Sequence, residues 1–156
     1  MISMELVESV LKQVEIVIRG DSTKFSIDKV KLLDSAINLY KWSSSGDAAS
    51  MSSNSDSTER EKFAAIAIKM HNKARNLTAE NNHDLRGLLK ATAAWLLLHF
   101  SKQTIGSFST IVKLLARAGG ALKEFRQFRT EALQCCIGAT NTYTRMSTAA
   151  LEKGDT

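Results

Sequence analysis

Apolar residues recur at helical spacing along most of this chain. The first run of such positions lies on one face and consists of Leu6, Val7, Val10, Leu11, Val14, Val17 and Ile18. Ser3 is placed to cap this helix and Gly20 to end it. A second helix is expected to begin near Ser26 and to carry Ile27, Val30, Leu33, Ile37 and Tyr40, with Trp42 just beyond its end. Residues 1–42 are therefore predicted to form an N-terminal pair of helices.

A serine-rich stretch follows at residues 43–57, where eight of fifteen positions are serine. It offers almost no apolar surface to bury, so it cannot offset the entropy lost on ordering. The sequence predicts a flexible loop there.

Residues 58–151 show the helical pattern again and are expected to form a helical repeat region. Thr58 and Glu61 have the spacing of a capping box. The third helix then carries Phe63, Ile66, Ala67, Met70, Ala74 and Leu77. A polar break at residues 81–84 ends it, and Asp84 is placed to cap a fourth helix that runs to about Lys102.

The fourth helix is apolar on nearly all sides, which is typical of a helix at the centre of an assembly. Two more helices follow, the fifth carrying Phe108, Ile111, Leu115, Ala118, Leu122 and Phe125, and the sixth carrying Ala132, Cys136, Ala139, Tyr143 and Met146. Leu88, Trp95 and Leu115 are expected in the core. No segment alternates with a period of two, so the fold class is all-α, with three antiparallel helix pairs in a single domain.

Composition agrees with this class. Proline is absent, aromatic residues make up 6% and glycine occurs eight times, which argues against a β-sandwich or barrel. The longest run of apolar residues, 93–98, is far shorter than the roughly 20 residues that a membrane span needs. We therefore expect an intracellular protein that does not span a membrane.

Positive charge is concentrated in the second half of the chain. Residues 85–156 contain ten basic and four acidic residues, a net charge of +6, whereas the whole chain has +5. This excess of positive charge suits an acidic protein partner or nucleic acid, although charged residues of this kind are also typical of a solvated helix face. The candidate partner surface consists of Lys113, Arg117, Lys123, Arg126 and Arg129.

Residues that could carry chemistry are scarce. His71, His83 and His99 have no partner at metal-ligand spacing, and the adjacent Cys135 and Cys136 point about 100° apart on a helix. Cys136 falls on the apolar stripe of the sixth helix, which indicates a small core residue. We expect no catalytic, cofactor-binding or metal-binding residues and no cofactor, and hence a protein that is not an enzyme.

Small residues in the last two helices fit the tetratricopeptide repeat. That repeat places small residues midway along its first helix, near the start of its second, and seven positions later. Gly120, Ala132 and Ala139 match these positions. The pattern predicts a short tetratricopeptide-like superhelix in which Gly120 allows close helix packing. A compact helical bundle is the alternative.

The order of segments from residue 63 to residue 146 resembles the opening of the meiotic tetratricopeptide scaffold family, which includes the yeast sporulation and zipper protein and its testis-expressed mammalian homologue. The resemblance is carried by Ala67 to Asn72, by Leu85-Arg86 with Ala91, and by Phe128 to Ala132. It implies a nuclear scaffold that gathers crossover or chromosome-axis proteins during meiotic recombination and synapsis. It also implies that the chain is either the N-terminal part of a longer solenoid or a truncated gene product.

The sequence therefore favours a non-enzymatic scaffold for protein–protein interaction. Two alternatives stay open: a helical adaptor that binds an acidic helix or peptide, and a basic helical module that binds nucleic acid. Steep salt dependence of DNA binding would favour the last of these.

Overall fold

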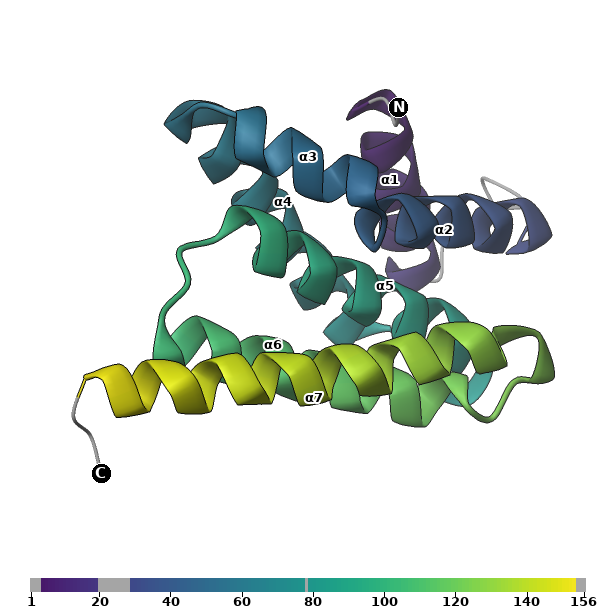
Figure 1. The fold of residues 1–156 in the computed structure, drawn as a ribbon. Coiled ribbons are helices and arrows are strands. Elements are labelled where there is room, and N and C mark those ends of the chain that lie inside the picture. Colours follow the sequence, from purple (N-terminus) through teal and green to yellow (C-terminus); the bar gives the residue numbers. More distant parts are fainter. Residues whose placement is uncertain (1–3, 20–28, 78, 154–156) are drawn as a thin grey trace.

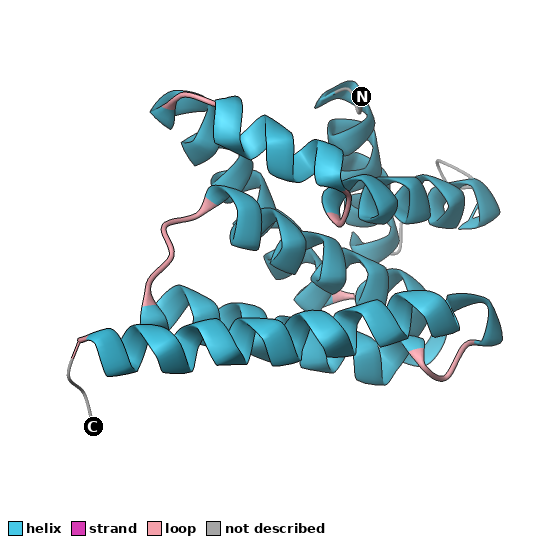
Figure 2. Ribbon diagram, viewed as in Figure 1, coloured by secondary structure: helices cyan, strands magenta, loops and turns pink. Residues whose placement is uncertain are grey.

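The computed structural model describes residues 4–19, 29–77 and 79–153, and every regular element within them is helical (Figures 1 and 2). The α-helices are α1 (Met4–Arg19), α2 (Lys29–Ser43), α3 (Gly46–Asn54), α4 (Ser57–Asn76), α5 (Ala79–Phe100), α6 (Ile105–Leu122) and α7 (Arg129–Glu152), with the 3-10 turn η1 (Arg126–Phe128) before α7. The all-α prediction is confirmed.

The first helix buries the face that its apolar spacing predicts. Val7, Val10, Leu11 and Val14 are the buried residues of α1. At the side of this face, Lys73 of α4 forms an ion pair with Glu15 of α1. The Lys73 ammonium group lowers the pKa of the Glu15 carboxyl. The expected cap Ser3 and terminator Gly20 lie outside the described residues, as do Ser26 and Ile27.

The register predicted for α2 is wrong in part. Its buried residues are Leu32, Ala36, Leu39, Tyr40 and Ser43, whereas Val30 is 69% exposed. Two overlapping apolar faces exist on this helix, and the side packed against α5 is the one centred on Leu32 and Ala36. Trp42 lies within α2 rather than beyond it.

The serine-rich stretch is not a loop, because residues 46–54 form α3. Ser45 caps this helix, and its hydroxyl oxygen accepts a hydrogen bond from the Ala48 N–H at 3.4 Å. The Ser52 hydroxyl donates to the Ala49 carbonyl at 2.7 Å, and α3 packs against α5 through its buried residues Ala48 and Ser52. The Ser45 cap and the contact with α5 support this short helix although it has very little apolar surface.

The start of α4 also differs from the prediction. Its N-cap is Asp56, whose carboxylate accepts from the Glu59 N–H at 2.8 Å, so the capping box assigned to Thr58 is wrong. An aspartate two residues earlier caps the helix directly and places Thr58 inside the first turn. The core face of α4 is as expected: Phe63, Ala67, Met70 and Ala74 are buried.

The break before the fourth predicted helix is present as a cap followed by a kink. Leu77 caps the end of α4, and Asn82 has non-helical backbone angles (φ −134°, ψ 21°) near the start of α5. The Asp84 carboxylate accepts a hydrogen bond from the Leu85 N–H at 2.8 Å.

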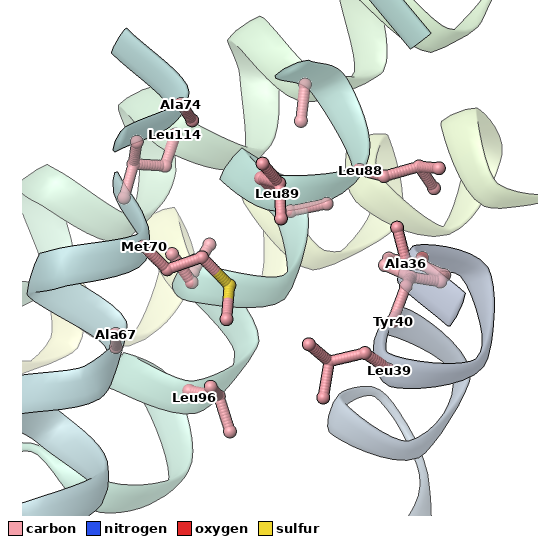
Figure 3. Close-up of a cluster of buried hydrophobic side chains, with 14 of the residues drawn as sticks. Ala36, Leu39, Tyr40, Ala67, Met70, Ala74, Leu88, Leu89, Leu96 and Leu114 are labelled. Atoms are coloured by element: carbon pink, nitrogen blue, oxygen red, sulfur yellow. The ribbon is translucent and has the colours of Figure 1, made fainter. Parts of the chain in front are cut away.

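Helix α5 lies at the centre, in contact with α2, α3, α4 and α6. Figure 3 shows Leu88, Leu89 and Leu96 of α5 between Ala36, Leu39 and Tyr40 of α2 on one side and Met70 of α4 on the other. Leu88 and Leu115 are fully buried, as predicted. Trp95 is only partly buried, because it lies at the edge of the core where α5 passes α7.

Helices α6 and α7 form the last antiparallel pair (Figure 1), and the glycine that allows their close approach is Gly119. A Cβ atom at Gly119 would lie 3.2 Å from Cys136 Sγ and 3.4 Å from the Ala132 carbonyl oxygen. Gly120 is exposed and has no atom within 4 Å of its Cβ position, so its assignment to the helix crossing is wrong. One residue is a rotation of about 100°, which turns Gly120 towards solvent.

The buried stripe of α7 differs correspondingly. It consists of Ala132, Cys135, Gly138 and Thr142. Ala132 is buried as expected, Ala139 lies at the edge of the core, and Cys136 is exposed rather than part of the core. The repeat spacing of Gly120, Ala132 and Ala139 therefore does not describe the packing of these two helices.

Candidate functional site

The side of α7 that faces away from α6 carries apolar side chains in solvent. Leu133 is 61% exposed and Ile137, one turn later, is 52% exposed. Residues four apart share one side of a helix, so Leu133 and Ile137 form one row. At about 100° per residue, this row is turned roughly half a revolution from the buried stripe of Ala132, Cys135 and Gly138. The result is an amphipathic helix whose outer side retains an apolar row.

A groove runs beside this row, between α7, α5 and the end of α2. It has a volume of about 170 Å³ and is lined by Ser44, Trp95, Gln134, Ile137, Gly138 and Asn141. Gly138 makes the groove possible, since a Cβ atom there would lie 2.9 Å from the Trp95 ring. Trp95 and Ile137 supply apolar walls, while Ser44, Gln134 and Asn141 supply polar groups. We call this groove together with Leu133 the α7 docking surface.

A buried polar cluster supports the floor of this surface. The Tyr40 hydroxyl donates to Gln134 Oε1 at 2.9 Å, which joins α2 to α7. Burial, reinforced by the neighbouring Cys135, raises the pKa of Tyr40 well above its ordinary value. Burial also raises the pKa of the Cys135 thiol to about 12, so this cysteine is protonated at neutral pH and is a poor nucleophile.

His99 is a partly buried residue between helices. Its Nε2 lies 2.9 Å from the Ser43 carbonyl oxygen, and its ring stacks on Trp95 with centroids 6.3 Å apart. Burial lowers the pKa of His99, the Ser43 hydrogen bond opposes this, and Arg145 adds to the lowering. The neutral imidazole therefore holds the end of α2 against α5 beside the docking surface.

This arrangement predicts a pH dependence of stability. Because the folded-state pKa of His99 is below its ordinary value of 6.5, its contribution is complete above that pH and is lost as the pH falls through the folded-state value. Urea unfolding at pH 7.5 and pH 5.5 should give a lower free energy of unfolding at the acidic pH. In the variant His99→Gln this difference should be smaller. An unchanged difference would show that His99 is solvated as in the unfolded chain.

The five basic residues selected from the sequence are all exposed, but they do not form one cluster. Lys113 and Arg117 lie one turn apart on α6, while Lys123, Arg126 and Arg129 lie around the turn into α7. Arg117 instead lies near His71 of α4 and Lys90 of α5. Burial lowers the pKa of both groups, and Arg117 lowers both further, together with Arg75 at His71 and Arg86 at Lys90. Charge counts along the sequence could not show that these residues lie near one another, because they come from the three helices α4, α5 and α6.

Other grooves in the described part of the chain lie between α1 and α4, between α6 and α7, and beside His83 and Phe125. No three His, Cys, Asp or Glu side chains gather there where they could hold a metal ion. None of the described helices has both the length and the apolar character of a membrane-crossing segment. Comparisons of the chain with protein-family models, curated proteins and solved structures found no match.

Proposed function

We propose that this chain is a non-enzymatic protein-interaction module that docks an acidic amphipathic helix of a partner protein on the α7 docking surface. The observation that carries the proposal is the apolar row of Leu133 and Ile137, which is exposed and continuous with the groove beside Trp95. An exposed row at helical spacing next to a groove is the geometry that receives an amphipathic helix.

Charge supports an acidic partner. Residues 85–156 have a net charge of +6. Of the exposed bases, Arg126 lies in η1 just before α7, Arg129 begins α7, and Arg145 lies along it. Acidic side chains flanking the apolar face of a bound helix would meet these bases at the rim of the interface. Rim charges of this kind mainly increase the association rate and select the partner.

A designed peptide tests this proposal. The probe is a 15-residue helix-forming peptide with leucines at helical spacing on one face and glutamates elsewhere, and binding is measured by fluorescence anisotropy. Ile137→Asp should weaken binding at least about tenfold, because a carboxylate replaces an apolar contact and repels the acidic peptide.

The matched control is Ile68→Asp on α4, since Ile68 is 53% exposed and Ile137 is 52% exposed. This variant makes the same change in side chain and charge at a distance from α7 and should leave the affinity unchanged. Equal weakening in both variants, or equally tight binding of a peptide with lysines in place of glutamates, would contradict the proposal.

A finer proposal places this module in meiotic recombination and chromosome synapsis in the nucleus, with crossover or chromosome-axis proteins as partners. It is supported by the order of segments from residue 63 to residue 146. The position of Gly120 gives it no support, because that residue is exposed where the repeat requires a helix contact.

A further inference from the structure

A cluster of positive charge lies where α4, α5 and α6 meet. His71 and Arg75 come from α4, Arg86 and Lys90 from α5, and Arg117 from α6. Burial lowers the pKa of His71, and the nearby Arg75, Lys90 and Arg117 lower it further. Burial also lowers the pKa of Lys90, to which Arg86 and Arg117 add. His71 therefore lies near three of the bases, and Lys90 lies near Arg86 and Arg117. We call these five residues the three-helix basic cluster.

No acidic group neutralises this cluster within the part of the chain that the structure describes. The ion pairs found there join Glu15 to Arg19 and to Lys73, and neither pair involves a member of the cluster. The four bases Arg75, Arg86, Lys90 and Arg117 therefore repel one another without a counter-charge, and a bound anion would relieve this repulsion.

Two nitrogen atoms of the cluster also lack partners. Arg86 Nε and His71 Nδ1 are shielded from solvent and make no hydrogen bond. Polar atoms shielded in this way are normally satisfied, and Arg86 Nε, which can only donate, lacks an acceptor. An anion with several acceptor oxygens would satisfy both the hydrogen-bonding and the charge requirement.

This cluster is distinct from the α7 docking surface. Arg86 and Lys90 precede Trp95 by nine and five residues on α5, so helical geometry turns both of them to roughly the opposite side of that helix. Trp95 faces Gly138 of α7, whereas Lys90 faces His71 of α4 and Arg117 of α6.

We propose that the three-helix basic cluster binds a phosphate monoester, carried as phosphoserine or phosphothreonine by a partner protein. The identity of the carrier rests on the proposed function. A phosphate monoester has about two negative charges and three strong acceptor oxygens in one compact group, and arginine is the side chain best suited to bind it. The cluster is compact and lies at a helix junction, whereas nonspecific nucleic-acid binding needs an extended track of bases with aromatic stacking surfaces.

The test is a titration of the full chain, followed by NMR, with an acetylated and amidated pentapeptide that contains one phosphoserine between alanines and glycines. Resonances of residues 71–75, 86–90 and 117 should shift. The double variant Lys90→Gln with Arg117→Gln should bind at least about tenfold more weakly, because two charges close to the phosphate are removed. Arg75→Gln with Arg86→Gln gives an independent variant pair, and the thermal midpoint checks the folding of each.

The control removes the same charge elsewhere. Lys123→Gln with Arg126→Gln, at the turn into α7, should change the affinity less than about twofold, since neither side chain is among the bases that lower the pKa of His71 or Lys90. Equal weakening by the control pair would reduce the effect to net charge and overturn the proposal. If a peptide with glutamate or serine in place of phosphoserine bound with equal affinity, the proposal would also be overturned. It would be overturned as well if a 20-nucleotide single-stranded DNA bound more tightly than the phosphopeptide and the control pair weakened DNA binding as much as the cluster variants do.

The outcome is separable from that of the proposed function. Ile137→Asp on α7 should leave phosphopeptide binding intact, because Ile137 lies on the other side of α5 from the cluster. If the phosphopeptide binds and the acidic helical peptide does not, the phosphate site is supported and the α7 docking surface is contradicted.

Discussion

Gly138→Leu should destabilise the protein by about 3 kcal/mol or more, at the upper end of overpacking effects. A Cβ atom at this position would lie 2.9 Å and 3.0 Å from Cη2 and Cζ2 of Trp95 and 3.2 Å from Cδ1 of Leu115. The indole is rigid and Leu115 is fully buried, so neither can move aside without disturbing the packing of α7 on α5 and α6. Urea unfolding monitored by circular dichroism measures the change.

The control for this substitution is Gly120→Leu. No atom lies within 4 Å of a Cβ at Gly120, so the added side chain enters solvent and the helix gains about 0.5–1 kcal/mol from the loss of a glycine. This outcome is the opposite of the one that the repeat pattern predicts for Gly120. Similar destabilisation at both glycines would show that the register of α6 and α7 described here is wrong.

Leu115→Ala should lower the free energy of unfolding by about 2–5 kcal/mol, because it removes a fully buried side chain and leaves a cavity. Leu133→Ala removes the same atoms from a side chain that is 61% exposed and should change stability by no more than about 0.5 kcal/mol. It should, however, weaken binding of the acidic helical peptide. A large loss of stability in Leu133→Ala would place that residue in the core and not on a docking surface.

Much of this fold can be predicted from the sequence where one apolar face is unambiguous. In α1 and α4 the spacing of residues such as Val10 and Met70 permits only one buried side. The central place of α5 follows from its lack of a polar face. These elements depend on periodicity within one helix, which is a local property of the chain.

The errors have physical causes that are not local. Two apolar faces overlap on α2, and its contacts with α5 and α1 select the one containing Leu32. Serine composition indicated a loop at residues 46–54, but serine hydroxyls also cap helices and bond to their carbonyl groups, as Ser45 and Ser52 do. Gly119 and Gly120 are indistinguishable by spacing until the partner helix is placed.

The candidate sites could be predicted even less well. Trp95 was expected in the core, and its position at a groove depends on Gly138, which is 43 residues away in the sequence. Arg117 was selected as a basic surface residue, but the groups whose pKa it lowers, His71 and Lys90, come from two other helices. Sites assembled across helices leave no periodic signal within any one of them.

Hydrogen exchange of the full chain with and without the acidic helical peptide tests the docking surface most directly. The proposal predicts slower exchange of backbone amides in residues 129–145 of α7 and at Ser44, with no change in α4 or in residues 113–117 of α6. Slower exchange confined to α4 and α6, or no change at a peptide concentration that saturates the anisotropy signal, would contradict the central claim that the outer face of α7 is where the partner binds.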